Sequence, residues 1–229
     1  MLLAIDTSTR YAGVALADEE RVVSCRVWYS SMNHTMELMP QIAESLEAQD
    51  IDVASLEGVA VALGPGGFSA LRVGMSVAKG LAMTGRTKIV GVGTLDLEAF
   101  PFLDSGLPVC ALLEAGRNEL ASAHFAPGGE RTKEDIICPL EEILETITEP
   151  LLICGEGVHG RTQQIKEMLG HLAVVVQPSP AARLWSLVAI ARQRLESGQV
   201  DDLADLQPYY LRMPSIGGPK IRDRKVQNA

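Results

Sequence analysis

The segment at 61–82, VALGPGGFSALRVGMSVAKGLA, constrains the fold of this chain more than any other. A short apolar run ends at the turn GPGG (64–67) and continues into a segment with helical spacing. Strand, glycine-rich turn and helix in this order are typical of α/β proteins, in which such a turn can hold a phosphate at the start of the helix. The glycines therefore indicate either a nucleotide-binding loop or a turn in which they serve another purpose.

Three motifs that use glycine-rich turns do not fit this segment. A P-loop needs lysine after its second glycine, and Ala70 stands there, with Lys79 about two turns further along the helix. The dinucleotide-binding fingerprint loses its third glycine to Ser69. A nucleophile elbow at 74–78 lacks its last glycine and lies inside the predicted helix. The turn therefore does not identify a nucleotide-binding or hydrolase site.

Small residues recur at every fourth position of the helix that follows the turn. Ala70, Gly74, Ala78 and Ala82 form a row with almost no side chain. Glycine inside a helix costs about 1 kcal/mol relative to alanine, and the close approach of another helix is the usual compensation. The approaching helix is either the amphipathic segment at 34–48 or part of a second protein chain. The alternative to an interface with a second chain is that the row packs only within its own chain. We predict a partner interface formed by Leu38, Ile42, Leu71, Gly74, Met75, Ala78 and Ala82.

Periodicity and turn residues predict alternating strands and helices in the first half of the chain. The expected strands are 2–6, 11–17, 21–30, 58–63 and 88–93, and the expected helices are 34–48 and 68–84. Pro40 must lie in the first turns of its helix, because proline cannot donate to the helical hydrogen-bond ladder. This order predicts a mixed sheet with helices packed on it.

The pattern restarts after a proline-bearing turn at 101–108. Glu114 follows a strand in the second half as Asp6 does in the first, so we predict a duplicated α/β unit. Further helices are expected at about 139–147, 160–169 and 180–197, and further strands near 151–154 and 172–176. We predict an N-terminal subdomain that carries the partner interface at 1–104, a smaller C-terminal subdomain at 105–215, and a flexible basic tail at 216–229.

Charge and cysteine content narrow the class of function. The chain has a net charge of −9, which disfavours unaided binding of nucleic acid because phosphate contacts need clustered Lys and Arg. The basic tail is the exception, and we expect it to be solvated, with a contact to RNA or to an acidic partner as the alternative. The four cysteines lack metal-binding or disulfide spacing, no apolar run spans a bilayer and no signal peptide is predicted. We therefore expect a cytoplasmic protein.

Six segments occur in an order that matches a known family: LLAIDTST, NHTMELMPQI, VALGPGGFSALRVGMSVAKGLA, VGVGTLDLEAF, LLEAGRNELASAHF and PYYLR. The chain resembles the bacterial TsaB (YeaZ) family of tRNA threonylcarbamoyladenosine biosynthesis proteins over most of its length, and most densely in residues 1–100. The resemblance implies an α/β protein of the actin/sugar-kinase/Hsp70-like (ribonuclease H-like) fold. It also implies two duplicated subdomains with mixed sheets and flanking helices.

The resemblance further implies a function. Proteins of this family are non-catalytic paralogues of TsaD, which they bind and activate through helices of the N-terminal subdomain. With the ATPase TsaE, the pair places a threonylcarbamoyl group on the adenosine next to the anticodon of tRNAs that read ANN codons. We therefore expect TsaD as the direct partner, TsaE in the same complex, tRNA bound only through the complex, and a homodimer when the chain is alone. No catalytic residue, metal, cofactor or membrane contact is expected.

The positions that carry chemistry in related proteins are altered here. In the catalytic paralogue a His-x-x-x-His metal motif follows the strand after the glycine-containing helix, and Thr94 and Glu98 stand at those positions. A hydroxyl and a carboxylate are poor substitutes for two imidazoles on a transition metal. Glu114 and Glu156 likewise depart from the nucleotide-binding pattern of the fold, and a carboxylate at Glu156 would oppose the charge of a nucleotide.

A turn after the first strand resembles the first phosphate hairpin of this fold. Its residues are Asp6, Thr7, Ser8 and Thr9, whose amides and hydroxyls are of the kind that face a phosphate. A turn closed by the side chain of Asp6 explains the same pattern equally well. We interpret these residues as a vestigial phosphate loop. The alternative function is an ATP-dependent kinase or ATPase of the same fold.

Overall fold

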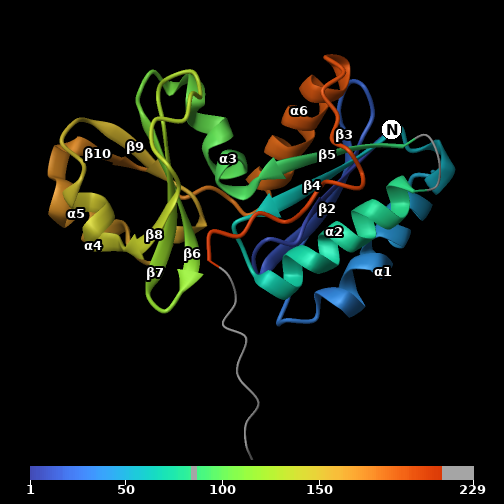
Figure 1. The fold of residues 1–229 in the computed structure, drawn as a ribbon, viewed down its shortest axis with the longest axis horizontal. Coiled ribbons are helices and arrows are strands. Elements are labelled where there is room, and N and C mark those ends of the chain that lie inside the picture. Colours follow the sequence, from blue (N-terminus) through green and yellow to red (C-terminus); the bar gives the residue numbers. More distant parts are fainter. Residues whose placement is uncertain (84–86, 213–229) are drawn as a thin grey trace, which may run out of the picture.

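The computed structural model describes residues 1–83 and 87–212, and the predicted tail at 216–229 lies outside these ranges. The chain forms two lobes, each built on a five-stranded mixed sheet (Figure 1). The first sheet, in the order β3-β2-β1-β4-β5, contains β1 (Leu2–Asp6), β2 (Tyr11–Ala17), β3 (Val22–Tyr29), β4 (Gly58–Gly64) and β5 (Lys88–Gly93). The second, in the order β10-β9-β6-β7-β8, contains β6 (Val109–Gly116), β7 (Glu119–Phe125), β8 (Ile136–Pro139), β9 (Leu151–Cys154) and β10 (Ala173–Val175).

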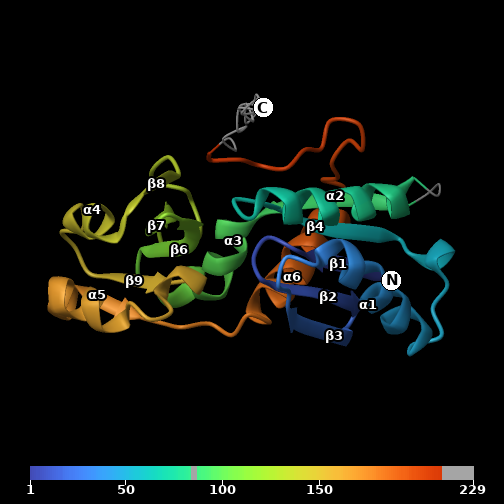
Figure 2. The ribbon, with the colours of Figure 1, turned by 90° about the horizontal axis from the view of Figure 1, so that it is seen from below.

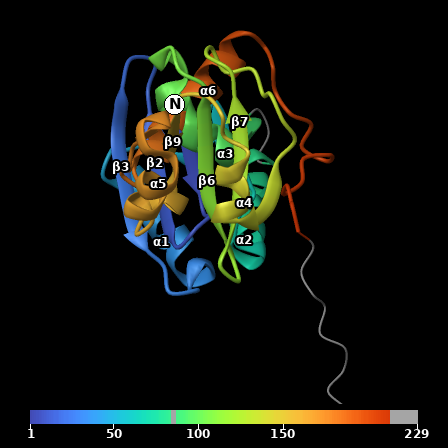
Figure 3. The ribbon, with the colours of Figure 1, turned by 90° about the vertical axis from the view of Figure 1, so that its left-hand side faces the viewer.

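Helices cover the sheets from both sides (Figures 1 and 3). In the first lobe α1 (His34–Glu47) and α2 (Phe68–Ala82) pack on one face and α6 (Ala182–Glu196) on the other. In the second lobe α4 (Leu140–Glu145) and α5 (Thr162–Leu169) pack on one face, and α3 (Thr94–Ala99) lies between the lobes. Short 3-10 helices occur at Val53–Ser55, Phe100–Ser105, Glu156–Val158 and Gly170–Leu172.

The two sheets have the same topology. β1 is antiparallel to β2 and parallel to β4, and β6 is antiparallel to β7 and parallel to β9 in the same way. Asp6 and Glu114 lie near the carboxyl ends of β1 and β6, at corresponding places in the two sheets. The expected duplicated α/β fold with mixed sheets and flanking helices is confirmed.

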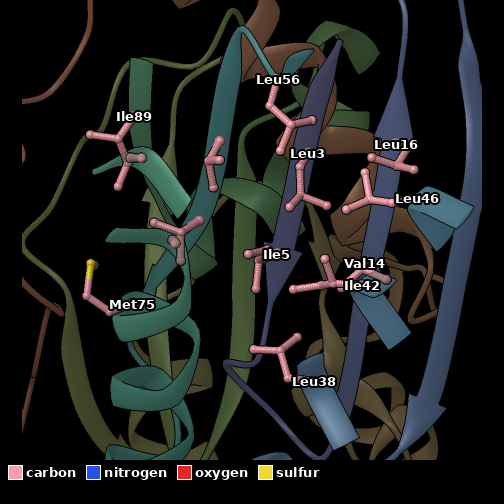
Figure 4. Close-up of a cluster of buried hydrophobic side chains, with 14 of the residues drawn as sticks. Leu3, Ile5, Val14, Leu16, Leu38, Ile42, Leu46, Leu56, Met75 and Ile89 are labelled. Carbon is pink, nitrogen blue, oxygen red and sulfur yellow. The ribbon is translucent and has the colours of Figure 1, made fainter. Parts of the chain in front are cut away.

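Strands β1, β2 and β4 of the first sheet are apolar on both faces because both faces are covered. Leu3 and Ile5 of β1 point to the side of α1 and α2, where they meet Leu38 and Ile42 (Figure 4). The alternate residues, such as Ala4, point to the opposite side and pack against α6. A strand buried on both faces reads as a continuous apolar run instead of an alternating one, as LLAI does in β1.

The row of small residues in α2 faces its own lobe, which corrects the predicted partner interface. Ala78 is fully buried against the first sheet, and a Cβ atom added at Gly74 would lie 2.3 Å from Thr7 Oγ1. The missing side chain therefore makes room for a turn of the same chain. All of the predicted interface residues are buried inside the subunit: Leu38, Ile42, Leu71, Gly74, Met75, Ala78 and Ala82. The helix turns its least bulky face to the sheet and leaves a different face exposed.

The subdomain boundary also differs from the expectation at α6. This helix falls in the range 105–215 predicted for the second subdomain, yet Leu184, Leu187 and Val188 pack on the first sheet. The segment 197–212 then runs back along the first lobe, with the amide of Tyr209 donating to the carbonyl of Leu63 over 2.7 Å (Figure 2). The amphipathic pattern of α6 predicted a helix correctly. The pattern does not specify which sheet the apolar side of this helix packs on, and the structure shows that it is the first.

Candidate functional site

Arg183, in the first turn of α6, lies buried where groups of the two lobes meet. The residue is 1% exposed, and its Nε donates to Asp6 Oδ2 over 2.6 Å. Nη1 donates to Glu98 Oε1 over 2.9 Å and to Glu156 Oε2 over 2.7 Å. Nη2 donates to Thr9 Oγ1 and to the carbonyl of Tyr11, both over 2.9 Å. Every N–H group of the guanidinium therefore has an acceptor.

The three carboxylates come from separate elements of the fold. Asp6 ends β1, Glu98 lies in α3, and Glu156 begins the 3-10 helix that follows β9. Asp6 and Arg183 belong to the first lobe, whereas Glu156 belongs to the second. We call Asp6, Glu98, Glu156 and Arg183 the Arg183 cluster. It connects the two lobes through buried ion pairs.

Burial controls the protonation of the cluster. Desolvation raises the pKa of Glu98, and the Coulomb attraction of Arg183 only partly opposes this effect. Burial also disfavours the charged form of Arg183, but the attraction of Asp6, Glu98 and Glu156 outweighs it and raises the pKa of the guanidinium. A buried charge without a partner is costly, so the arginine and the carboxylates depend on each other.

The predicted phosphate hairpin lies at this cleft, and its groups are bonded within the chain. Asp6 Oδ1 accepts hydrogen bonds from the amide and the hydroxyl of Ser8, over 2.9 and 2.6 Å. The hydroxyl of Thr7 donates to the carbonyl of Ala70 over 2.7 Å, and Thr9 Oγ1 is held by Arg183. The turn is therefore closed by the side chain of Asp6, which is the structural interpretation that the sequence left open.

The glycines of the turn at 64–67 are needed for close packing. A Cβ atom added at Gly66 would lie 2.2 Å from the carbonyl oxygen of Ser8, whose partner is the amide of Gly67 at 2.8 Å. Gly64 has a φ of +111°, and a Cβ atom there would lie 2.5 Å from the carbonyl oxygen of Tyr209. The loop thus brings the start of α2 against the hairpin and the C-terminal segment, which answers the question raised by its sequence.

A cavity of about 600 Å³ opens beside the cluster, between the hairpin and the first turns of α1 and α2. Its volume lies within the range of small-molecule sites. Arg10 supplies a cation at the mouth, whereas Glu114 and Glu156 make the wall from the second lobe acidic. Glu114 is paired with Arg161 of the same lobe. Glu156 is likewise paired with Arg183, so both carboxylates of this wall are engaged by arginines of the chain.

The positions of the metal motif do not fit a transition metal. Thr94 is fully buried at the start of α3, and Glu98 is bonded to Arg183 and to the amide of Glu156. Within residues 1–83 and 87–212, no three His, Cys, Asp or Glu side chains are arranged to hold a metal ion. His34 Nε2 lies 3.1 Å from the carbonyl oxygen of Thr9, and burial lowers the pKa of His124 to about 4. We therefore derive no metal chemistry at this site.

Arg183 was missed by reasoning from the sequence. Glu98 and Glu156 were noted as departures from family patterns, but nothing in the sequence predicted that they meet Asp6 at one guanidinium. One signal was present: Arg183 lies four residues before Leu187, on the core-facing side of an otherwise apolar helix. A charged residue in such a row indicates a buried partner, because unpaired charges are excluded from cores.

The outer faces of α1 and α2 form the second feature of the first lobe. The two helices lie next to each other on the same side of the sheet (Figures 1 and 3). Met36 and Met39 of α1 are 77% and 46% exposed. On α2 the exposed residues Arg72, Ser76 and Gly80 follow one another at helical spacing, and nothing lies within 4 Å of a Cβ atom added at Gly80. We call Met36, Met39, Arg72, Ser76 and Gly80 the outer helical face.

Comparison with known proteins relates the chain to tRNA modification. A profile of the family described as TsaD, tRNA N6-adenosine threonylcarbamoyltransferase, matches residues 29–161, which is more than half of the chain. The tRNA threonylcarbamoyladenosine biosynthesis protein TsaB of Bacillus subtilis is 26% identical over 98% of this chain and 99% of that protein. The tRNA N6-adenosine threonylcarbamoyltransferase of Trichlorobacter lovleyi is 33% identical, over 45% of this chain and 38% of the enzyme.

A solved structure has the same fold over nearly all of the chain. YeaZ from Pseudomonas aeruginosa superimposes with a TM-score of 0.73 at 22% identity, covering 92% of this chain and 99% of that one. The similarity to the TsaB of Bacillus subtilis and to YeaZ thus spans nearly the whole chain, whereas the similarity to the transferase of Trichlorobacter lovleyi covers less than half of either chain. In the two ranges that the structure describes, no helix has the length and apolar character needed to cross a membrane.

Proposed function

Because the chain belongs to the TsaD family of tRNA N6-adenosine threonylcarbamoyltransferases, we propose that it is a non-catalytic scaffold that binds and activates a catalytic TsaD subunit. Its role lies in tRNA threonylcarbamoyladenosine biosynthesis, the process for which its full-length TsaB relatives are named. The reaction of the complex is the threonylcarbamoylation of the adenosine next to the anticodon in tRNAs that read ANN codons. In this proposal TsaE joins the complex. The tRNA is bound by the complex and not by this chain alone.

The observation that carries the proposal is the position of Arg183. Its guanidinium is buried beside the cavity and forms ion pairs with Asp6, Glu98 and Glu156, the acidic groups around which chemistry would be organised. This arrangement supports a non-catalytic role. It also weighs against the rival kinase or ATPase, because the carboxylate of Asp6 is bonded to Arg183 and Ser8 on both oxygens. Hydrolysis of ATP by the purified chain would favour the rival.

The outer helical face is the partner surface in this proposal. Exposed methionines adapt to irregular apolar partners, and large exposed apolar side chains on adjoining helices are typical of interaction sites. Gly80 strengthens the argument, because a glycine in a helix is destabilising and no residue of the described chain packs against it. The approach of a partner helix to the backbone at Gly80 would offset this cost.

The test is tRNA modification reconstituted from TsaD, TsaE, the threonylcarbamoyl donor and tRNA, with and without this chain. We expect modified adenosine to form only when the chain is present. The double variant Met36→Glu/Met39→Glu places charges on the outer helical face and should lower both TsaD capture and product formation by about tenfold or more. Met168→Glu is the matched control, since Met168 is 44% exposed on α5 of the other lobe. Equal activity of the double variant and the control would refute the assigned surface.

A further inference from the structure

We infer that the Arg183 cluster is a latch that holds the two lobes closed without a ligand and thereby fixes the position of the first turns of α2. The part of this inference that concerns the partner rests on the proposed function. The closure of the lobes does not, because it depends only on contacts within the chain.

The lobes have separate hydrophobic cores that share one helix. Leu97 of α3 packs in the core of the first lobe with α6, whereas Leu95 and Ala99 of the same helix pack in the core of the second. Two separate cores joined at one short helix can pivot about it, because little apolar surface is lost in such a motion. Other contacts between the lobes must then determine whether the cleft is open or closed.

The Arg183 cluster provides such contacts at the pivot. Glu156 of the second lobe accepts from Arg183 Nη1 over 2.7 Å, and its amide donates to Glu98 Oε1 of α3 over 3.2 Å. The side chain of Arg183 is 2% exposed and that of Glu156 is 14% exposed, so the ion pair is largely shielded from water. Opening the cleft would separate these charges. The latch therefore favours a closed cleft in the absence of nucleotide.

A second tie crosses between the lobes through the C-terminal segment. Arg212 pairs with Glu119 of β7 over 2.6 Å, while Tyr210 stacks on Phe68 of α2 at 4.9 Å between ring centroids. Arg212 and Glu119 are both partly exposed, so this ion pair is screened by water and contributes less than the buried one. Of these two ties, the Arg183 cluster is the one more strongly shielded from water.

The same cluster is connected to α2 by a continuous series of hydrogen bonds. Asp6, held by Arg183, binds the amide and hydroxyl of Ser8, and the carbonyl of Ser8 accepts from the amide of Gly67. The hydroxyl of Thr7 donates to the carbonyl of Ala70 one turn further along. The hairpin thus joins the latch to the start of α2. A substitution at Glu156 would therefore alter the position of α2 and, with it, the outer helical face, although Glu156 is not part of that face.

The latch is tested with Glu156→Ala, compared with Glu114→Ala. Both remove a carboxylate at the cleft wall of the second lobe, but the partner of Glu114 is Arg161 of the same lobe, so that pair does not cross the cleft. Spin labels are attached at two exposed positions, Glu20→Cys in the first lobe and Lys166→Cys in the second, and Cys25 and Cys138 are replaced by serine. Electron paramagnetic resonance then measures the distance between the two labels.

We expect one narrow distance distribution for the parent chain and for Glu114→Ala, and a broader, longer one for Glu156→Ala. Glu156→Gln keeps an oxygen acceptor for Arg183 and should broaden the distribution less. Circular dichroism checks that all variants keep their secondary structure. A distribution for Glu156→Ala that coincides with that of Glu114→Ala overturns the latch.

TsaD affinity tests the coupling to α2. Glu156→Ala should weaken TsaD binding at least about fivefold, whereas Glu114→Ala should leave it unchanged. Broadened distances with unchanged affinity would overturn the coupling and leave the latch itself standing. If the parent chain does not bind TsaD at all, the proposed function fails, and the label distances still decide whether the latch exists.

Discussion

At the scale of single residues, this molecule is distinguished by a fully buried arginine that has three carboxylate partners. One bidentate carboxylate would accept from only two of the five N–H groups of Arg183, which instead divides three of its donors among Asp6, Glu98 and Glu156. Lysine could not replace it, because an ammonium group lacks the planar fork that reaches several acceptors at once. The geometry favours a specific arrangement of three elements over maximal stability, since buried ion pairs contribute little net stability compared with apolar packing.

Removal of the guanidinium should be strongly destabilising. Arg183→Met keeps much of the side-chain volume but leaves three carboxylates buried without a cation, and we expect the free energy of unfolding to fall by about 3–5 kcal/mol at neutral pH. Urea denaturation measures this change. Arg21→Met is the control: Arg21 is 78% exposed, and its loss should change stability by less than about 0.5 kcal/mol. Equal effects of the two substitutions on the free energy of unfolding would show that the Arg183 cluster does not depend on its guanidinium for stability.

The raised pKa of Glu98 predicts a pH dependence of stability. Burial raises this pKa above the ordinary value of 4.5, so at pH values between the ordinary and the raised pKa the folded chain holds a proton that the unfolded chain has lost. Glu98 therefore contributes stability that is fully present below the ordinary glutamate pKa and is lost as pH rises through the raised value. Glu98→Gln has no proton to lose at this position.

Denaturation midpoints at a series of pH values test this prediction. The stability of Glu98→Gln relative to the parent chain should increase as pH rises from the ordinary glutamate pKa to neutrality. Glu44→Gln, at an exposed residue of α1, serves as the control and should not show this increase. Parallel pH curves for the parent chain and Glu98→Gln would contradict the assigned pKa direction.

At the scale of elements, α2 shows how one helix serves two purposes. Its small residues face inward, where Gly74 admits the hairpin at Thr7, while Gly80 is exposed and no atom of the described residues lies within 4 Å of a Cβ atom added there. Two glycines of one helix, less than two turns apart, thus differ in their surroundings: Gly74 is packed inside the lobe and Gly80 is exposed. A helical wheel drawn from the sequence identifies the row but does not say whether it faces the sheet of its own lobe or another chain.

Two alanine substitutions in α2 distinguish the packed glycine from the exposed one by their effects on stability. Gly80→Ala should raise the free energy of unfolding of the isolated chain by about 0.5–1 kcal/mol, because alanine is the better helix former and meets open space. Gly74→Ala should lower it by about 1–3 kcal/mol, because its Cβ would lie 2.3 Å from Thr7 Oγ1. Thermal and urea denaturation measure both changes. If both substitutions destabilise the chain equally, the assignment of the outer face is wrong.

At the scale of the whole molecule, the duplicated lobes have diverged in what covers them. The first sheet is enclosed by α1 and α2 on one side and α6 on the other, and its outer helical face carries exposed methionines. The second lobe has two short helices, α4 and α5, on one face. Most of the exposed methionines belong to the first lobe, which is where we propose that the partner binds.

The outer helical face should also govern self-association when TsaD is absent. We expect the isolated chain to sediment as a homodimer at high concentration, because an unpartnered apolar surface of this kind associates with a second copy. Met36→Glu/Met39→Glu should shift the chain to a monomer, while Met168→Glu should leave the dimer intact. A monomeric parent chain at all concentrations in sedimentation velocity would refute this prediction.

Local patterns in the sequence determined most of the elements of this protein. A short apolar run located β1, and the glycine–proline turn marked the boundary between β4 and α2, because these signals depend on neighbours in the chain. Two elements were not predicted from the sequence: α3, which has six residues, and β8, which has four. The duplication was visible as well, since Glu114 repeats the position of Asp6.

Only the tertiary structure decided which surfaces meet. The inward direction of Gly74, the packing of α6 on the first sheet and the meeting of Glu98 and Glu156 at Arg183 all join residues far apart in the chain. Periodicity states that a helix has an apolar side, but many partners satisfy that side equally well. Their selection depends on shape and on the pairing of buried charges, which are properties of the assembled fold.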